Sequence, residues 1–489
     1  MNYHSTRNTK EKITAAQAIA QGLAADGGLF VPDQLPGVDR EELERFCAMD
    51  YRGRAAAIMT KFLPEFGKEE LESFVAKAYG DNFFHKAIAP VKSLDDSTAF
   101  LELWHGPTCA FKDMALQMLP YLLTASLKKC GEEREVCILV ATSGDTGKAA
   151  LEGFKDVEGT KIFIFYPRDG VSDIQRLQMV TQEGGNVGVC SVLGNFDDAQ
   201  TGVKQIFSDG AFAEELTQRA WFLSSANSIN WGRLLPQIVY YFSAYCDCVN
   251  AGSVKLGEEM NFCVPTGNFG NILAGWYAWK MGLPVGRLIC ASNKNNVLTD
   301  FINTGCYNKN RPFHTTISPS MDILVSSNLE RLLYNLGGDA IVRESMAELN
   351  KEGEYRVSSE LLAQVRESFR AGCCDDEQTK AAIRSVFERH GYLMDTHTAV
   401  AYKVLGDYRQ ESGDERFTVV VSTASPFKFA ADVLDALNAP AGEDPLKALS
   451  AASGMPIPKP LAGLEEREIR FSQSVEKSQM MGAVDQFLM

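Results

Sequence analysis

The sequence predicts an α/β protein with open, largely parallel sheets that carry helices on both faces, together with a mainly helical N-terminal domain. Two observations predict this class. From about residue 134 onward, short apolar runs alternate with amphipathic runs, which is typical of βαβ units and of parallel strands buried on both faces. Residues 1–95 show helical periodicity instead. The length of 489 residues favours two or three domains.

The N-terminal region is expected to hold helices at 14–23 (TAAQAIAQGL) and 68–79 (KEELESFVAKAY). An Asp-Gly-Gly turn at 26–28 interrupts them and leads into the apolar run LFVP at 29–32. Five units of a strand followed by a helix come later. Their ranges are 135–142 with 147–154, 161–167 with 172–180, 260–266 with 272–282, 287–293 with 296–302, and 417–423 with 427–437.

Two further segments have a distinct character. The stretch from about 325 to 415 is highly charged and mainly helical in pattern, which predicts solvated helices packed on the sheet. The run GMPIPKPLAGLEER at 454–467 is expected to form an extended closing arm, because its prolines break periodic structure.

Charge and composition exclude several classes of partner. The chain has 48 basic and 63 acidic side chains and a net charge of −15, which argues against nucleic acid and against an anionic membrane surface. The N-terminus lacks the apolar core of a signal peptide, and no apolar run is long enough to span a bilayer. Twelve scattered cysteines are expected to be buried thiols in a reducing cytoplasm.

The first candidate ligand loop is VPTGNFGNILAG, at the end of an apolar strand. In open α/β sheets, ligands collect beyond the carboxyl ends of strands, where helix N-termini direct N–H groups outward. Gly267 and Gly270 flank Asn268 and Phe269, and Asn271 is expected to start a helix. Such glycines let the backbone approach a phosphate closely. A glycine turn that merely joins a strand to a helix is the alternative.

The second loop, VATSGDTGKAA, crowds four polar side chains at a strand end. Thr142, Ser143, Asp145 and Thr146 offer hydroxyl and N–H donors to a carboxylate or a phosphate. A plain helix cap is the alternative, since Ser, Thr and Asp are favoured capping residues. Four polar groups in five positions exceed the needs of one cap.

The third loop is VVVSTASPFKF, where a buried strand ends in Ser422 and Thr423 before Pro426. A hydroxyl at this position can bond a ring nitrogen, or it can satisfy a local backbone group. The six histidines supply no metal-ligand spacing, so no metal site is expected. His105 and His397 are expected to be structural histidines.

Lys112 lies alone in HGPTCAFKDMALQ, between Phe111 and Met114 and behind a Gly-Pro turn. A desolvated lysine has a lowered pKa and is a better nucleophile. A phosphate loop, an anion loop, a hydroxyl at a strand end and an isolated lysine together fit pyridoxal phosphate, which has a phosphate, a ring nitrogen and an aldehyde that condenses with a lysine amine.

Over nearly its whole length the chain resembles the longer threonine synthases of bacteria and fungi, within the tryptophan-synthase-β-like group of pyridoxal-phosphate enzymes. The segments that carry the resemblance are YHSTRN, GLAADGGLFVP, LWHGPTCAFKDMALQ, ATSGDTGKAA, NSINWGRLLPQIVYYF, VPTGNFGNILAGWYAWKMGLP, ASNKNNVLTDF and DTHTAVAYKV. The resemblance implies that Lys112 forms the internal Schiff base and that Thr423 faces the pyridine nitrogen. The residues that it implies for the cofactor phosphate are Gly267, Asn268, Phe269, Gly270 and Asn271.

Two features depart from the wider pattern. The family usually has Thr-Ala-His-Pro near its end, whereas Ser425 stands here in the place of the histidine and Phe427 follows the proline. Asp145 stands where many relatives in the wider group have asparagine, although the longer threonine synthases commonly carry aspartate.

The division expected on this resemblance has three parts. Residues 1–95 form the helical N-terminal domain, and 96–129 with 226–489 form a large cofactor-binding domain that includes the C-terminal arm. Residues 130–225 form a smaller α/β domain with the second loop. The protein is expected to be cytoplasmic and a monomer or homodimer.

The implied reaction converts O-phosphohomoserine and water to L-threonine and phosphate, the last step of threonine biosynthesis. The residues expected to bind the substrate carboxylate or phosphate are Thr142, Ser143, Asp145, Thr146, Asn230 and Arg233. Arg233 suits a phosphate because its planar fork donates two hydrogen bonds, and a salt bridge on its own helix is the alternative.

Two other functions stay open. One is a threonine-synthase-like phospho-lyase that eliminates phosphate and releases a 2-keto acid, an outcome that Ser425 keeps open. The other is a degenerate paralogue that acts as a binding or scaffold protein, against which the intact Lys112 and the intact loops argue.

Overall fold

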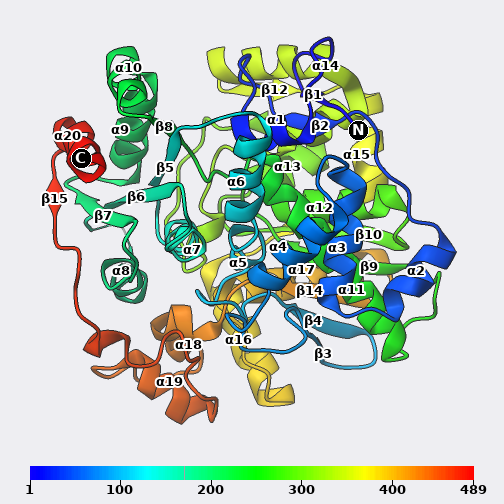
Figure 1. The fold of residues 1–489 in the computed structure, drawn as a ribbon. Helices are drawn as coiled ribbons and strands as arrows, with labels where there is room; N and C mark the ends of the chain where they lie inside the picture. The colour runs from blue at the N-terminus through cyan, green and yellow to red at the C-terminus, as the bar shows by residue number, and fades with distance from the viewer. Residues whose placement is uncertain (170) are drawn as a thin grey trace.

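The computed structural model describes residues 1–169 and 171–489. It contains a six-stranded sheet of order β13-β10-β9-β14-β4-β3 and a five-stranded sheet of order β15-β7-β6-β5-β8, which Figure 1 shows on opposite sides of the molecule. The paired strands run parallel in both sheets, apart from β3, which is antiparallel to β4. The predicted α/β class with largely parallel sheets is confirmed.

The strands of the large sheet are β3 (Val91–Ser93), β4 (Thr98–Glu102), β9 (Met260–Pro265), β10 (Val285–Ser292), β13 (Phe369–Cys373) and β14 (Thr418–Ser422). Those of the small sheet are β5 (Glu135–Ala141), β6 (Thr160–Pro167), β7 (Val187–Val192), β8 (Trp221–Ser224) and β15 (Ser474–Val475). Two short pairs complete the set, β1 (Tyr3–Ser5) with β2 (Phe30–Pro32) and β11 (Cys306–Asn308) with β12 (Glu354–Arg356).

The middle of the large sheet determines where the site forms. β14 lies between β4 and β9, with Val420 opposite both Phe100 and Cys263. These three strands are buried along their whole length. Because they run parallel, their carboxyl ends meet at one edge, and ligands of open α/β sheets bind at such an edge.

All five predicted strand-to-helix units are present. The helices that follow β5, β6, β9, β10 and β14 are α7 (Asp145–Phe154), α8 (Asp173–Val180), α12 (Gly270–Met281), α13 (Val297–Thr304) and α18 (Ala430–Ala436). The last of them is preceded by a 3-10 turn, η2 (Pro426–Phe429). The continuous apolar strands made these units recognisable, since a parallel strand is buried on both faces.

The other helices cover the two sheets. They are α1 (Ala15–Gln21), α2 (Arg40–Cys47), α3 (Tyr51–Phe62), α4 (Lys68–Ala78), α5 (Asp113–Leu116), α6 (Leu119–Lys129), α9 (Phe196–Ser208), α10 (Gly210–Gln218), α11 (Trp231–Asn250), α14 (Leu329–Lys351), α15 (Ser359–Ser368), α16 (Asp376–His390), α17 (Thr396–Ser412), α19 (Pro445–Ser453) and α20 (Met480–Leu488). α11 is buried on nearly every side, as expected of a helix that is apolar all round.

The N-terminal region is helical as predicted, but it has no separate core. Its buried side chains belong to the same cluster as those of α11 and of the large sheet. Phe46 of α2 packs edge-on against Phe242 of α11, with ring centroids 5.9 Å apart. The expected boundary at residue 95 falls inside the β3–β4 hairpin, and β3 belongs to the large sheet. The N-terminal helices therefore complete the large domain.

The end of the chain corrects the predicted division. Residues 226–489 are predicted to belong to the large domain, but β15 pairs in parallel with β7 of the small sheet. Val484 and Leu488 of α20 are buried in the core of that sheet, and Figure 1 shows this red segment beside β7 and α9. A strand of two residues has no periodic signal, so its sheet could not be assigned from sequence.

The charged stretch 325–415 is mainly helical as predicted, through α14 to α17. It also contains β13, which forms an edge of the large sheet beside β10. Its sequence, FRAGC, lacks a continuous apolar run, so it gave no strand signal. Within the described ranges, no helix combines the length and the apolar character needed to cross a bilayer.

Candidate active site

Lys112 and Thr423 are brought together at the carboxyl ends of β4 and β14. The N–H of Phe111 donates to the carbonyl of Thr423 at 2.8 Å, and Ala110 forms an isolated bridge with Ala424. Lys112 follows at once and is the N-cap residue of the short helix α5. Two segments that are far apart in sequence thus form one strip of backbone at the predicted cofactor site.

The Lys112 amine is removed from bulk water but touches polar groups. Its Nζ donates to Ser320 Oγ at 3.1 Å, lies 3.7 Å from Asp145 Oδ2, and lies 5.5 Å from the centre of the Phe111 ring. Burial lowers the pKa of Lys112; the Asp145 carboxylate opposes this shift, and the cations Lys428 and Arg233 add to it. A lysine whose neutral form is favoured is a suitable nucleophile and general base.

The first loop forms the start of α12, one residue earlier than predicted. Its left-handed residue is Phe269, with φ 62°, and Gly270 is the first residue of the helix. A Cβ added to Gly267 would lie 2.6 Å from the carbonyl oxygen of Ser320, whereas one added to Gly270 would meet nothing closer than 3.4 Å. Close backbone packing therefore requires glycine at Gly267, whereas a Cβ at Gly270 would make only ordinary van der Waals contacts with the protein.

The first turn of α12 offers unpaired donors to an anion. Asn271 Oδ1 accepts hydrogen bonds from the hydroxyls of Tyr240 and Tyr241, at 2.7 and 2.8 Å. Asn271 Nδ2 is buried and has no partner among the described residues. The carbonyl of Asn268 accepts from the backbone N–H of Asn328, so the loop is anchored from behind. An orphaned donor at a helix N-terminus fits a phosphate.

Asp145 carries the second loop into the site. It is the first residue of α7 and is 5% exposed, so its charge must be held by protein groups. Its Oδ1 lies 2.7 Å from Lys428 Nζ and accepts from Gln175 Nε2 at 3.0 Å. Burial raises the pKa of this carboxyl, but Lys428 and Lys112 outweigh burial, and the resulting pKa lies below the ordinary value.

The other polar residues of the second loop differ in their roles. Thr142 Oγ1 accepts from the backbone N–H groups of Gly144 and Gly147, at 3.0 and 2.9 Å, and so closes the loop. Ser143 is exposed and Thr146 is half-buried, so both hydroxyls are accessible. The structure gives Thr142 a local role, while Ser143 and Thr146 stay predicted substrate groups.

Asn230 is the N-cap of α11 rather than a free polar group. Its Oδ1 accepts from the N–H of Gly232 at 2.8 Å, and its Nδ2 donates to the carbonyl of Ile19 at 2.9 Å. The side chain is buried. Both polar atoms of the side chain are thus paired within the protein, so the geometry does not support the predicted substrate contact of Asn230. Residue type alone does not distinguish a capping residue from a ligand-binding one.

Arg233 is a buried guanidinium without a carboxylate. Its Nη1 donates to the carbonyl of Ala226 at 2.7 Å, and its buried Nε has no partner in the described part of the chain. Burial lowers the pKa of Arg233 to about 10, so it stays charged at neutral pH. Arg233 forms no salt bridge with any of the described residues, so the alternative of a salt bridge on its own helix is wrong. Arg233 can therefore donate to an anion.

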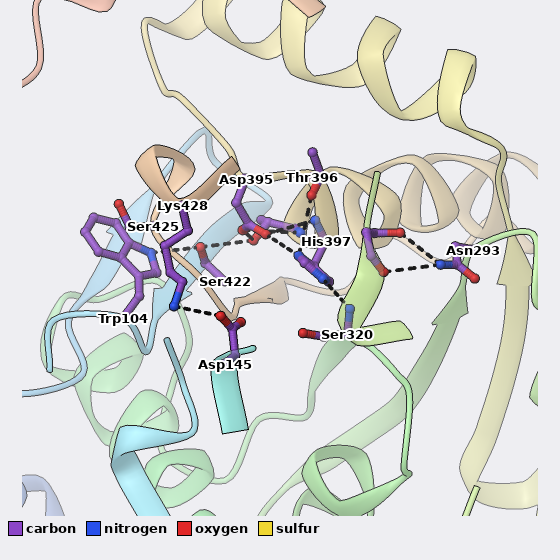
Figure 2. Close-up of polar contacts among 12 residues, drawn as sticks. Trp104, Asp145, Asn293, Ser320, Asp395, Thr396, His397, Ser422, Ser425 and Lys428 are labelled. Carbon is purple, nitrogen blue, oxygen red and sulfur yellow. Dashed lines mark hydrogen bonds and ion pairs between the residues drawn. The ribbon is translucent and has the colours of Figure 1, made fainter. Parts of the chain in front are cut away.

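Two residues of the site were missed by the sequence analysis. Ser320 lies in a 3-10 turn and contacts Lys112. Lys428 lies in η2 and contacts Asp145 (Figure 2). Ser320 gave no signal, because its loop follows no apolar strand. Lys428 did give one: like Lys112, it is a single lysine that follows a phenylalanine in a largely apolar run.

The two histidines singled out from the sequence have structural partners. His397 Nδ1 pairs with Asp395 Oδ1 at 2.9 Å, and its Nε2 accepts from the Ser320 N–H at 3.2 Å (Figure 2). His397 thus holds the turn that contacts Lys112. His105 Nε2 pairs with Glu102 Oε2 at 2.8 Å.

Ser425 and Phe427, which depart from the family pattern, are both buried at the start of η2. The N–H of Phe427 lies 3.4 Å from Ser425 Oγ, so the serine caps this short turn. The hydroxyl therefore has a local backbone role in the position where the family usually has histidine.

The residues fit pyridoxal phosphate. The first turn of α12 provides an unpaired donor for the phosphate in Asn271, and Lys112 provides a buried amine next to the backbone contact between Phe111 and Thr423. Around the amine, the cations Lys428 and Arg233 outnumber the one carboxylate, Asp145. An anionic ligand would balance this excess of positive charge.

Comparisons with known proteins agree with this geometry. Three family profiles match: threonine synthase N terminus over residues 2–79, pyridoxal-phosphate dependent enzyme over 92–424, and threonine synthase C-terminal over 398–487. The chain is 40% identical over 435 residues to a threonine synthase of Pseudomonas aeruginosa, covering 88% of this chain and 89% of that protein.

Human threonine synthase-like 1 is 41% identical over 446 residues, which cover 88% of this chain. The match spans only 59% of the length of that relative. Among solved structures, threonine synthase from Brucella melitensis, described as bound to pyridoxal phosphate, has a TM-score of 0.88 at 38% identity, covering 100% of this chain and 98% of the other. Yeast threonine synthase has a TM-score of 0.90 at 33% identity, with the same coverage.

The family profiles span most of the chain, the Pseudomonas relative matches at nearly full length, and the lysine, the phosphate loop and the anion loop lie together. The cofactor of this enzyme is pyridoxal 5′-phosphate. The chain belongs to the threonine synthase family of pyridoxal-phosphate-dependent enzymes.

Proposed function

We propose that this protein converts O-phosphohomoserine and water to L-threonine and inorganic phosphate, the last step of threonine biosynthesis. The observation that carries the proposal is a pair of buried donors without a partner among the described residues: Nδ2 of Asn271 on α12 and Nε of Arg233 on α11. Asn271 suits the cofactor phosphate, and Arg233 suits a substrate that carries its own phosphate.

When bound, pyridoxal phosphate supplies an aldehyde that condenses with amines and a ring that withdraws electrons from the substrate carbon. Lys112 would bind that aldehyde and, when its amine is free, take and return protons, because burial favours its neutral form. Asn271 and the backbone of 267–270 would hold the cofactor phosphate, and Thr423 would face the ring nitrogen.

Substrate groups are assigned by exposure and charge. Arg233 would hold the substrate phosphate and stabilise it as a leaving group, since its donors lie in a buried and weakly screened site. Ser143 and Thr146 would bind the carboxylate, because their hydroxyls are accessible beside Asp145.

A phospho-lyase is the second candidate, and Ser425 favours it. The position usually held by a histidine carries here a hydroxyl engaged in a backbone cap, so the proton-transfer group that a histidine would supply is absent at this position. The lyase would release phosphate, ammonia and a 2-keto acid in place of threonine.

Product analysis with O-phosphohomoserine distinguishes the two reactions. The proposal predicts threonine and phosphate in equal amounts. Equal amounts of phosphate and 2-ketobutyrate, with no threonine, would establish the lyase. If a protein that has bound its cofactor forms neither threonine nor 2-ketobutyrate, the result would support the scaffold hypothesis and contradict the proposal.

We also propose that the protein is cytoplasmic and is a monomer or homodimer. In support, all 12 cysteines are free in the described structure and eight of them are buried, as expected in a reducing compartment. Sedimentation analysis of the purified protein tests the oligomeric state, and a trimer or larger assembly would contradict this assignment.

A further inference from the structure

Asp145 is shared between two lysines that come from different parts of the large domain. Its Oδ1 lies 2.7 Å from Lys428 Nζ, and its Oδ2 lies 3.7 Å from Lys112 Nζ. The Lys428 side chain is completely buried, and its Nζ also donates to the carbonyl of Thr108 at 3.1 Å. Figure 2 shows Lys428 extending from η2 toward Asp145 at the start of α7.

This arrangement differs from an ordinary structural ion pair. A buried lysine is costly unless its charge is paired and its hydrogen bonds are satisfied. Lys428 has both partners, but its acid is the same carboxylate that approaches the cofactor lysine. The pair also joins the two sheets, because η2 follows β14 of the large sheet and α7 follows β5 of the small sheet.

We propose that Lys428 is a positioning residue of the active site. It holds the Asp145 carboxylate through Oδ1, fixes the second loop against the large domain, and leaves the nitrogen of Lys112 able to lose its proton. The inference rests on the assignment of Lys112 as the cofactor lysine. It does not depend on whether the product is threonine or a keto acid.

The charges around these groups determine the sign of each effect. Lys112 is influenced by Asp145, Lys428 and Arg233. The groups influenced by Lys428 are Asp145, Asp113, Lys148 and the thiol of Cys109. Asp145 stabilises a proton on the Lys112 nitrogen, and Lys428 opposes it. The nitrogen keeps a proton-binding position when it is bonded to the cofactor aldehyde, so the same signs hold in the holoenzyme.

The test is a pH titration of the visible absorption of the holoenzyme. Lys428→Met should move the midpoint to higher pH, by about one unit or more, as nearby charges in buried sites typically do. Asp145→Asn should move the midpoint to lower pH. The double variant should lie between the two single variants and should unfold at a higher temperature than Lys428→Met, because it buries no unpaired carboxylate.

Lys148→Met is the matched control, since Lys148 is also buried but pairs with Glu152 at 3.1 Å within α7. Its midpoint should move clearly less than that of Lys428→Met. Equal shifts in these two variants, or a downward shift in Lys428→Met, would overturn the inference. If the single variant Lys428→Met does not fold, the double variant is compared with Asp145→Asn alone. The midpoint of the absorption titration must then lie at higher pH in the double variant. A cofactor bonded to a lysine other than Lys112 would instead contradict the site assignment.

Discussion

The two walls of the active site differ in how many of their buried polar atoms are already paired. On the wall that α11 and α12 form, Arg233 Nε and Asn271 Nδ2 have no partner in the part of the chain that the structure describes. On the wall that the second loop forms, the Thr142 hydroxyl closes its own loop and Asp145 pairs with Lys428.

This difference indicates that the two walls have different roles. An unpaired buried donor costs about 1–3 kcal/mol, so the first wall gains stability when an anion binds there. On the second wall, Thr142 and Asp145 are already paired without a ligand, and Asp145 contributes a fixed negative charge. The first wall is therefore expected to determine affinity for phosphate groups, and the second to set the protonation of Lys112.

The largest effect is expected for Lys112→Ala, which removes the group that both walls serve. Activity should fall roughly 10³-fold or more, because the nucleophile and the proton-transfer group are lost together. The visible absorption of the lysine-bound cofactor should disappear while thermal stability of the cofactor-free protein changes little. Lys403→Ala, which breaks an ion pair within α17, serves as the control and should keep full absorption.

Two glycine variants on the first wall separate cofactor binding from backbone packing. Gly270→Ala should weaken cofactor binding by about tenfold or more without loss of stability, because the added Cβ meets only ordinary contacts in the protein and lies in the helix turn that we propose to hold the phosphate. Gly267→Ala should lower both cofactor affinity and thermal stability, since its Cβ would lie 2.6 Å from the Ser320 carbonyl oxygen. Equal stability losses in the two variants would contradict this comparison.

Arg233→Lys tests whether the second anion site binds substrate. Lysine keeps the charge but cannot donate to Ala226 and to a phosphate with the same planar fork, so kcat/KM should fall roughly ten- to hundred-fold. Affinity for the cofactor should not change. Arg331→Lys is the buried control: its donors are already bonded to Phe30, Asn328 and Ile229, so it should lower stability and leave kcat/KM within about twofold of the wild-type value.

The smallest effect is expected for Asn230→Ala. Loss of this helix cap should reduce the free energy of unfolding by about 1 kcal/mol and leave kcat/KM nearly unchanged. Denaturant unfolding and steady-state kinetics measure the two quantities. A tenfold fall in kcat/KM would indicate that Asn230 binds substrate. Asn230 would then not differ from Arg233 in the way that its capping role implies.

Much of the fold followed from the sequence because buried parallel strands are continuous apolar runs. The units that begin with β5, β9 and β14 are examples. Strands that are short or interrupted, such as β13 and β15, gave no such signal. Their pairing depends on which sheet edge is left open, and that is a property of the whole fold.

The site was predictable in part for a similar reason. Lys112 and the glycine loop stood out because their residue types are unusual in apolar surroundings. Asn230 and Thr142 could not be classified, since capping a backbone and binding a ligand require the same polar atoms. Lys428 is also a lone lysine in a largely apolar run, so it could have been singled out from the sequence. Its bond to Asp145 could not, because nothing in sequence brings η2 next to α7.

The central claim is that Lys112 carries the cofactor at the junction of the two walls. Borohydride reduction of the holoenzyme, followed by proteolysis and mass spectrometry, tests it directly, because reduction makes the link between lysine and cofactor permanent. We expect the pyridoxyl group on Lys112 and no label in Lys112→Ala. A label on Lys428, Lys148 or any other lysine of the wild-type protein would contradict the account.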